Sequence, residues 1–267
     1  MPLKVKDIVN IMEDYAPVKL KESYDNVGLM VGDSSCEVTK ILIALDCTLK
    51  VIEEAIKCGC NLIITHHPLL FKKPNSITTD TLQGKKIIKL IKNNINLYSS
   101  HTNLDSTPNG INEIIMNVLG FNKGRILETS VLNQEAGIGR IATLNEPSTL
   151  EELIHRVKLR LNIEAIRYCG DEAKTISKVA VINGSGEDYI AMAIKQGAEC
   201  IITGDTTYHY ISDYNEDGIA IIDAGHFETE WPAMKIVADI INNGVKLLGF
   251  NTSTIMSKDT INPYKFK

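Results

Sequence analysis

The segment VTKILIALDCTLKVIEEAIKCGCNLIITHH at residues 38–67 decides the fold, because it recurs without a gap at residues 176–205 as ISKVAVINGSGEDYIAMAIKQGAECIITGD. Each copy contains an apolar run, a helical stretch that ends at a glycine, and a second apolar run. Glycine favours helix ends because it adopts the left-handed backbone conformation at little cost. Continuous apolar strands separated by helices are typical of parallel sheets covered on both faces. The repeat therefore predicts two similar α/β halves.

The pattern continues beyond each copy. The first copy is followed by a helix predicted over residues 81–93 and by an apolar strand at 95–99. The second copy is followed by a shorter link and a strand at 219–223. We therefore expect an α/β protein made of two duplicated α/β/α sandwich halves with mostly parallel sheets.

The predicted division of the chain follows from the same pattern. The first half spans residues 1–128 and the second spans 129–234, since glycine and polar residues interrupt the pattern near 126–135. The last helix, predicted at about residues 231–242, is expected to return the segment 235–267 to the first half. Ser148-Thr149-Leu150-Glu151 has the composition of a capping box and predicts the start of another helix.

Composition excludes several classes of protein. The chain has 267 residues, 44% of them hydrophobic and 23% charged, as is ordinary for a globular protein. A net charge of −5 argues against a nucleic-acid-binding protein. The N-terminus lacks the features of a secretory signal, and no apolar stretch approaches the ~20 residues that cross a bilayer. The six scattered cysteines favour reduced, buried thiols, so we expect a cytoplasmic location and no membrane partner.

Histidines and acids gather where the apolar strands end. Open α/β sheets bind ligands beyond the carboxyl ends of their strands, and three strands predicted here end in potential metal ligands. These ligands are His66, His67, His101, Asp105, His226 and Glu230. The concentration of four of the six histidines in these segments makes a metal site in the cleft between the halves the leading hypothesis.

The spacing of these residues supports the hypothesis. His101 and Asp105 are four residues apart, as are His226 and Glu230, and residues four apart share one face of a helix. The adjacent pair before Pro68 differs, because neighbouring residues of an extended strand point in opposite directions. His66 and His67 could therefore bind two ions only if a turn redirects both side chains.

The residue types indicate which metals would bind. Imidazoles with carboxylates suit zinc, iron, manganese, nickel or cobalt rather than calcium. Six ligands shared by two divalent ions leave open positions for water, which is the arrangement of catalytic sites rather than structural ones.

Other polar residues have weaker cases. Asp25 could form an ordinary turn or could orient a metal-binding imidazole, and we favour a role beside the cleft. The segment 183–186 (Asn-Gly-Ser-Gly) could cradle a phosphate, but a plain strand-to-helix turn is favoured. His155 is expected on a solvated helix face, whereas His209 could line the cleft or lie in a surface turn.

The motifs together resemble those of the GTP cyclohydrolase 1 type 2 homologue family, also known as Ngg-interacting-factor-like dinuclear metal proteins. The matching segments are Tyr24-Asp25-Asn26-Val27-Gly28-Leu29, Thr65-His66-His67-Pro68, His101-Thr102-Asn103-Leu104-Asp105 and Gly225-His226-Phe227-Glu228-Thr229-Glu230. They occur in the family's order, and the closing segment 259–263 (Asp-Thr-Ile-Asn-Pro) is also similar. The family's usual tryptophan before Asp25 is Tyr24 in this chain.

The resemblance implies a dinuclear metal centre, with all six ligands present in this chain. It also implies a toroidal homohexamer whose metal sites face the interior. The cyclohydrolase name transfers more safely than the reaction does.

Two functions follow from these observations. In the first, the protein is a metal-dependent hydrolase that acts on a small, nucleotide-like substrate through a metal-bridging hydroxide. Glu230 and Asp105 are then the candidate catalytic residues, which bridge the ions or move a proton. In the second, the protein is a non-catalytic metal-binding scaffold that regulates its partners.

Overall fold

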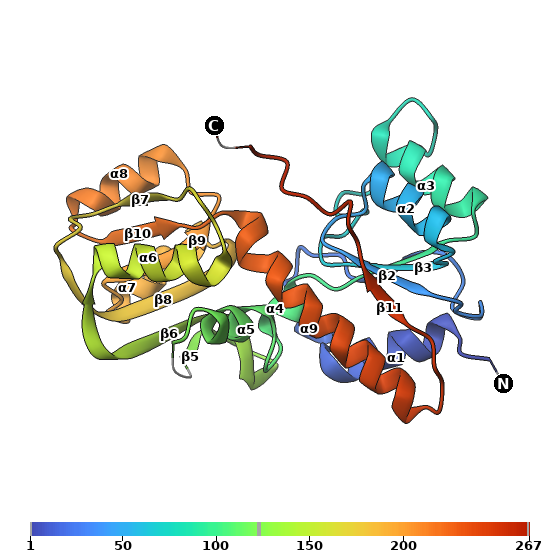
Figure 1. The fold of residues 1–267 in the computed structure, drawn as a ribbon, viewed down its shortest axis with the longest axis horizontal. Coiled ribbons are helices and arrows are strands. Elements are labelled where there is room, and N and C mark those ends of the chain that lie inside the picture. Colours follow the sequence, from blue (N-terminus) through green and yellow to red (C-terminus); the bar gives the residue numbers. More distant parts are fainter. Residues whose placement is uncertain (1, 122–123, 266) are drawn as a thin grey trace. The chain divides into compact units, whose positions relative to one another are not determined.

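The chain folds into two compact units. A computed structural model describes residues 2–121, 124–265 and 267. The first unit contains Met1–Leu104 and Met234–Pro263, and the second contains Asp105–Ala233 together with Tyr264–Lys267. Each unit is built around its own β-sheet (Figure 1).

The first unit begins at the N-terminus and is completed near the C-terminus. Its helices and strands are α1 (Val5–Tyr15), the 3-10 helix η1 (Val18–Leu20), β1 (Gly28–Val31), β2 (Ile41–Ala44), α2 (Leu49–Cys58), β3 (Leu62–Thr65), α3 (Leu82–Lys92), β4 (Asn96–Ser99) and β11 (Thr254–Met256). Two further helices, α4 (Thr102–Ser106) and α9 (His226–Leu247), contain the points at which the chain passes from one unit to the other.

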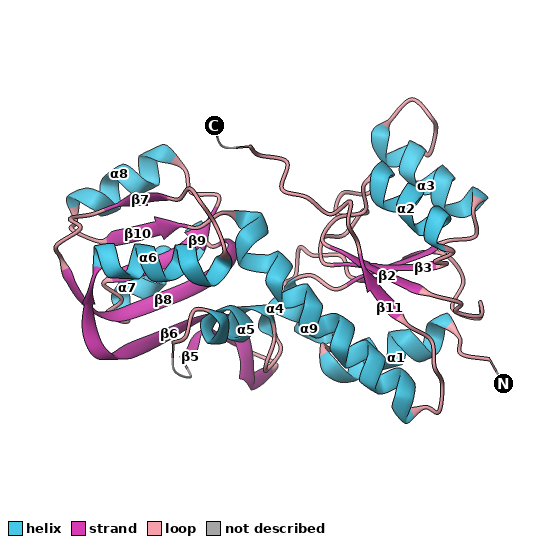
Figure 2. Ribbon diagram, in the orientation of Figure 1, coloured by secondary structure: helices cyan, strands magenta, loops and turns pink. Residues whose placement is uncertain are grey.

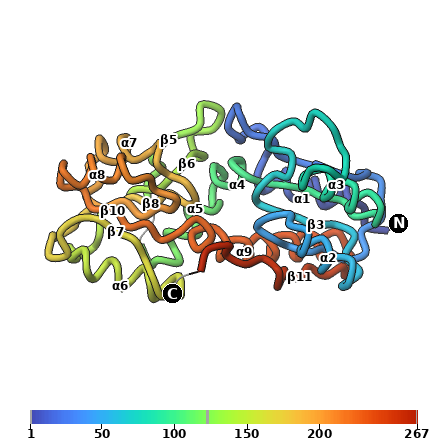
Figure 3. The backbone as a smooth tube through the Cα atoms, turned by 90° about the horizontal axis from the view of Figure 1, so that it is seen from above, coloured from blue at the N-terminus to red at the C-terminus, as the bar shows by residue number. Residues whose placement is uncertain are grey.

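The sheet of the first unit is mostly parallel, as expected. Its strand order is β1-β4-β3-β2-β11, and only the edge strand β1 is antiparallel to its neighbour among the described pairings. Strand β11, red in Figures 1 and 3, pairs in parallel with β2, so the C-terminal segment returns to the first unit. The carboxyl ends of β3 and β4 therefore lie at the same end of the sheet, where Thr65 is opposite Ser99.

Helices cover both faces of this sheet (Figure 2). On one face, α2 and α3 bury residues such as Ile52 and Leu90 against Leu42 and Ile63 of the strands. On the other face α1 packs against α9, where Gly244 lies against the side chain of Ile11. The result is the predicted three-layer sandwich.

Local sequence signals set the ends of these helices. Thr48 caps α2 by accepting a hydrogen bond from the backbone N–H of Val51, and Gly59 ends the helix in the left-handed conformation at φ 68°. Thr81 caps α3 in the same way.

The second unit contains the other elements. They are α5 (Ile111–Val118), β5 (Arg125–Ser130), β6 (Asn133–Thr149), α6 (Leu150–Leu161), β7 (Arg167–Cys169), β8 (Thr175–Ser185), the 3-10 helix η2 (Glu187–Tyr189), α7 (Ile190–Lys195), β9 (Cys200–Gly204), α8 (Tyr208–Glu216) and β10 (Ala220–Asp223). The predicted capping box is present one residue further on, with Thr149 as the N-cap of α6 and Glu152 as its partner.

The sheet of the second unit is mixed rather than mostly parallel. Its order is β5-β6-β8-β9-β10-β7, and among the described pairings only β8 with β9 and β9 with β10 are parallel. Strands β5 and β6 are joined by a tight hairpin, which can connect only antiparallel strands. Helices α7 and α8 cover one face, where Ile190 and Ile211 pack near Ile201, and α6 lies over the other (Figure 2).

The division between the units differs from the one expected at residue 128. The polar stretch near 126–135 is the β5–β6 hairpin, whose tip exposes Val131 almost completely. The segment just before the hairpin, from Asp105 onwards, belongs to the second unit, because α5 packs on β6 and β8. Buried Arg140 of β6 also lies 3.7 Å from Glu113 of α5. The strand and helix pattern of the sequence is interrupted at a turn within the second unit, whereas the division between the units falls inside α4.

The two copies of the repeat keep the same strand register. Ile41 of β2 is opposite Leu62 of β3, and the equivalent residues Val179 and Cys200 are opposite one another in β8 and β9. No helix among the described residues is both long and apolar enough to span a membrane.

Candidate metal centre

Three predicted ligands of the first unit lie together; we call His66, His67 and His101 the imidazole group. Their potential ligand atoms lie within 4.8 Å of one another. The ring centroids of His66 and His101 are 5.0 Å apart, although the two residues follow different strands. They meet because β3 and β4 are parallel neighbours whose carboxyl ends lie at the same end of the sheet.

A turn brings the adjacent histidines to the same side. Strand β3 ends at Thr65, so the alternation of an extended strand does not apply to the next two residues. The N–H of His67 donates to the carbonyl of Leu45 at 3.0 Å, and the hydroxyl of Thr65 donates to the carbonyl of His67 at 2.9 Å. The two rings are consequently only 5.1 Å apart.

Each ring of the imidazole group uses its Nδ1 atom to bind an oxygen. His66 bonds the carbonyl of Ser100 at 2.9 Å, His67 bonds Asp46 at 2.9 Å and His101 bonds Asp25 at 3.0 Å. Carbonyl and carboxylate oxygens only accept, so Nδ1 carries the proton and, in the neutral ring, Nε2 carries the lone pair. This arrangement orients a histidine towards a metal ion.

Asp25 orients an imidazole, as favoured from the sequence. Burial opposes ionisation of its carboxyl group, but hydrogen bonds from His101 and Thr102 outweigh that effect and hold its pKa well below the ordinary value. The backbone N–H of Thr102 donates at 3.0 Å and its hydroxyl at 2.5 Å to the second carboxylate oxygen. Both oxygens of Asp25 are thus fixed, which fixes the ring of His101.

The second unit holds the other three predicted ligands; we call Asp105, His226 and Glu230 the carboxylate group. His226 is the first residue of α9 and Glu230 lies one turn further on, and the four-residue spacing brings Nε2 and Oε2 to 3.1 Å. The Nδ1 atom of His226 bonds Asp205 at 2.7 Å, so this ring is oriented like those of the imidazole group.

Asn183 joins the two acids of the carboxylate group. Its side-chain amide donates to Asp105 at 2.8 Å and to Glu230 at 3.3 Å. Both carboxylates are buried, so a shared donor reduces the repulsion between them. The side chain of Asn112 accepts from the backbone N–H of Asn183 at 3.3 Å and donates to the carbonyl of Asp105 at 3.2 Å.

Gly184 makes room for the acid. It has a positive φ of 60°, and a Cβ atom there would lie 2.2 Å from Oε1 of Glu230 and 3.4 Å from Nε2 of His226. Only glycine combines this backbone conformation with so close an approach.

Sequence reasoning missed the roles of Asn183, Gly184, Asp46 and Asp205. The segment 183–186 is not the plain turn expected from the sequence, because its first three residues end strand β8 and the side chain of Asn183 binds two acids. The repeat contained a signal, since Gly184 is equivalent to Asp46 and Asp205 is equivalent to His67. All of these positions lie at strand ends next to candidate ligands.

The remaining polar candidates take no part in either group. His155 is exposed on α6, as expected, and His209 is exposed on α8 beside the ring of Tyr208. The six cysteines are free, and three of them are only half-buried. Burial raises the pKa of Cys47 to about 12 and that of Cys60 to about 11, so these thiols stay protonated.

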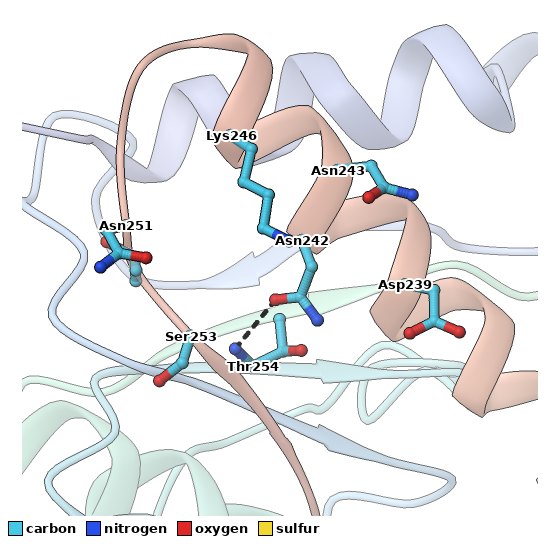
Figure 4. A pocket seen from close by; sticks show the side chains of 8 residues that line it. Asp239, Asn242, Asn243, Lys246, Asn251, Ser253 and Thr254 are labelled. Atoms are coloured by element: carbon cyan, nitrogen blue, oxygen red, sulfur yellow. Dashed lines mark hydrogen bonds between the residues drawn. The ribbon is translucent and has the colours of Figure 1, made fainter.

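A surface hollow in the first unit lies apart from these ligands. It has a volume of about 490 Å³ and is lined by residues from the end of α9 and the start of β11, as Figure 4 shows. The side chain of Asn242 accepts from the N–H of Thr254 at 3.2 Å and so joins the helix to the strand. None of the six predicted ligands lines the hollow, so we assign it no part in the chemistry.

The donor types of both groups fit a divalent transition metal. Imidazole nitrogen and carboxylate oxygen suit zinc, iron, manganese, nickel or cobalt. The hydrogen-bonded Nδ1 atoms of all four histidines are typical of metal ligands. The six residues present therefore fit the group that the sequence predicted.

Comparisons with known proteins identify the family of this chain. The family model Duf34/NIF3 (NGG1p interacting factor 3) matches residues 3–263. Relatives named "GTP cyclohydrolase 1 type 2 homolog" come from Clostridium acetobutylicum, 58% identical over all of both chains, and Clostridium perfringens, 52% identical over 99% of this chain and all of the relative. A crystal structure of Staphylococcus aureus hypothetical protein SA1388 superposes with a TM-score of 0.92 at 31% identity, over the full length of both chains. These findings confirm the resemblance indicated by the four motifs. This chain belongs to the Duf34/NIF3 family.

Proposed function

We propose that this protein is a metal-dependent hydrolase that acts on a nucleotide-like substrate. In the proposal, the six predicted ligands hold two divalent metal ions. The observation that carries it is the orientation of the histidines, because Nδ1 of each candidate ligand is bound to a carbonyl or carboxylate oxygen. Four histidines with purely structural roles would not all need the same arrangement.

The donor set supports a catalytic rather than a structural centre. Three ligands for each ion leave positions open for water and substrate, whereas structural sites are closed by four protein ligands. When bound, a pair of divalent ions activates a water molecule as a nucleophile and neutralises the negative charge that develops on the substrate.

The carboxylate group supplies the residues for proton transfer. Asp105 and Glu230 are buried and share the amide of Asn183, so each carboxylate is held in a defined position. A carboxylate within reach of an attacking water can accept its proton and return it to the leaving group. Glu230 is the stronger candidate, since it also lies 3.1 Å from a ligand nitrogen of His226.

The test is turnover of a nucleotide panel by protein loaded with manganese, zinc or iron. We expect metal-dependent hydrolysis of at least one nucleotide, and its loss in Glu230→Gln, which keeps the size of the side chain but removes its charge. Glu228→Gln is the matched control, because residues two apart on α9 point to different sides of the helix. It should retain activity.

Three outcomes would contradict the proposal. Turnover could survive removal of the metal, or it could survive in Glu230→Gln. Alternatively, the protein could bind metal tightly while no nucleotide shifts its thermal unfolding, which would favour the non-catalytic scaffold.

Assembly as a homohexamer remains part of the proposal. Light scattering coupled to size-exclusion chromatography should give a mass six times the 29.5 kDa of the chain. A monomer or dimer at micromolar concentration would contradict this assembly.

A further inference from the structure

Two exposed aromatic side chains adjoin the imidazole group in the first unit. Phe71 lies 6.2 Å from the ring of His101, and Tyr24 lies 6.3 Å from Phe71, both in edge-to-face arrangements. Tyr24 is 64% exposed and Phe71 is 46% exposed. We call Tyr24 and Phe71 the aromatic wall. The aromatic wall places two solvent-exposed rings in succession next to a predicted metal ligand.

Anchors on both sides hold the aromatic wall in place. Phe71 follows Leu69 and Leu70, which are half-buried against the core beneath α2 and α3. The side-chain amide of Asn26 donates to the carbonyl of Leu70 at 2.8 Å, and that of Gln83 donates to the carbonyl of Leu69 at 2.9 Å. The loop is thus fastened at the residues just before the exposed ring.

Tyr24 is held from the other side. It precedes Asp25, whose buried carboxylate binds His101 and Thr102. The residue after that, Asn26, reaches across to the loop of Phe71. The same short segment therefore orients a candidate ligand and presents an aromatic ring.

We propose that the aromatic wall binds the planar heteroaromatic ring of the substrate. Single exposed apolar residues are common and need no explanation, but two rings in contact that end at a candidate metal ligand form a surface for stacking. Aromatic side chains stack on nucleobases of every kind, since each base has a π face. Exposed Lys72 and Lys73 follow Phe71 directly and would favour a ring that carries phosphate.

This inference rests on the proposed function, because it assigns the substrate class of the same site. It differs in what it predicts, since ring binding depends on Phe71 and Tyr24 and not on turnover. The two can therefore fail separately.

The test is calorimetric titration of the manganese-loaded protein with GMP and, as a probe without a ring, with ribose 5-phosphate. We expect GMP to bind more tightly, and Phe71→Ala to weaken GMP binding about tenfold with little change for ribose 5-phosphate. Phe71→Tyr should restore GMP binding, because it keeps the ring. Tyr24→Ala should weaken GMP binding in the same direction as Phe71→Ala.

Ile91→Ala is the matched control for a lost exposed apolar side chain. Ile91 is 58% exposed in the last turn of α3. That end of the helix leads into the start of β4, whereas the imidazole group lies at the carboxyl ends of the strands. Ile91 is therefore at the other end of the sheet. GMP binding should be unchanged in this variant, and the metal content of all variants should equal that of the unmodified protein.

Several results would overturn the inference. GMP could bind no more tightly than ribose 5-phosphate, or Phe71→Ala could weaken both probes equally. Phe71→Ala could also change the oligomeric mass without changing ring binding, which would make the aromatic wall an assembly contact. If ring binding depends on Phe71 but no nucleotide is hydrolysed, the proposed function fails and the inference stands.

Discussion

The two copies of the repeat share one frame and carry different chemistry. Strands β2 and β3 pair in the same register as β8 and β9, with Ile41 opposite Leu62 and Val179 opposite Cys200. After the equivalent threonines Thr65 and Thr203, however, the first copy continues into two histidines and the second into Gly204 and Asp205. Apolar residues buried in the strands fix the frame, whereas residues beyond the strand ends are not needed for packing.

The side chains behind the ligands differ in the same way. The imidazole group is held by acceptors, namely a carbonyl and the carboxylates of Asp25 and Asp46. The acids of the carboxylate group are held by a donor, the amide of Asn183. A neutral imidazole ligand must donate through its second nitrogen, and a carboxylate can only accept. Each ligand type therefore determines the polarity of its own support.

The candidate histidine that follows the strand lies one residue further along the chain in the second half than in the first. Ser99 and Asp223 occupy equivalent positions, because each is opposite a threonine at the same position of the repeat, Thr65 or Thr203. His101 follows Ser99 by two residues, but His226 follows Asp223 by three. His226 consequently lies within α9, whereas His101 precedes α4. The repeated spacing from histidine to acid is thus similar in sequence without being equivalent in structure.

The largest expected effect is the loss of metal when either group loses a ligand. In His101→Ala and Glu230→Ala, we expect elemental analysis of the purified protein to find fewer ions per chain than in the unmodified protein, because each side chain donates to an ion in the proposal. His155→Ala removes a histidine exposed on α6 and should keep the full metal content. Two ions per chain in either ligand variant would break the comparison.

A smaller effect is expected where the second copy requires glycine. Gly184→Ala should lower the free energy of unfolding by about 1–3 kcal/mol more than Gly218→Ala in urea titrations. Both residues have positive φ, at 60° and 73°, so the backbone strain is similar. Only at Gly184 would the new Cβ meet another side chain, that of Glu230. Equal losses would show that the carboxylate moves aside freely.

The next effect concerns the orienting acids. We expect Asp25→Asn to weaken manganese binding about 10- to 100-fold, since an outer hydrogen-bond partner contributes roughly this much. Asp205→Asn should weaken it less, because the side chain of Asp205 is 48% exposed and that of Asp25 is fully buried. Titration of manganese monitored by electron paramagnetic resonance gives both affinities. An equal or larger loss in Asp205→Asn would contradict the reasoning from burial.

The smallest effect concerns the C-terminal segment that completes the first sheet. Buried Glu54 accepts hydrogen bonds from the hydroxyl of Ser257 at 2.5 Å and from the N–H of Lys258 at 2.9 Å. Burial raises the pKa of Glu54, but hydrogen bonds from Lys258, Ser257 and Asp259 outweigh it and lower the pKa overall. We expect Glu54→Gln to reduce the free energy of unfolding at neutral pH by about 1–2 kcal/mol.

The sign of the pH dependence follows from the lowered pKa. The stability that Glu54 contributes is present above the ordinary glutamate pKa of about 4.3 and is lost as the pH falls through the lower folded value. The difference between the unmodified protein and Glu54→Gln should therefore shrink in acid. Neighbouring Glu53→Gln is the control, since its ion pair with Lys89 is exposed and should contribute little. A difference that grows in acid would contradict this assignment.

Much of the fold could be predicted because the relevant signals are local. Apolar periodicity, capping residues and helix-ending glycines act within a few residues, so the repeat predicted the sandwiches and the edge at which ligands would gather. The division of the chain was less accessible. A hairpin turn near residue 130 and a linker have similar compositions, and only the packing of α5 on β6 and β8 distinguishes them.

By itself, the sequence determined which residues are candidate ligands, their order along the chain and their positions after buried strands. The tertiary structure decided which of them lie together and how each is held. Asp25 and His101 are 76 residues apart, and Asn183 and Asp105 are 78 apart. A hydrogen bond over such a separation leaves no periodic trace in sequence, because its geometry depends on the path of the whole chain between its partners.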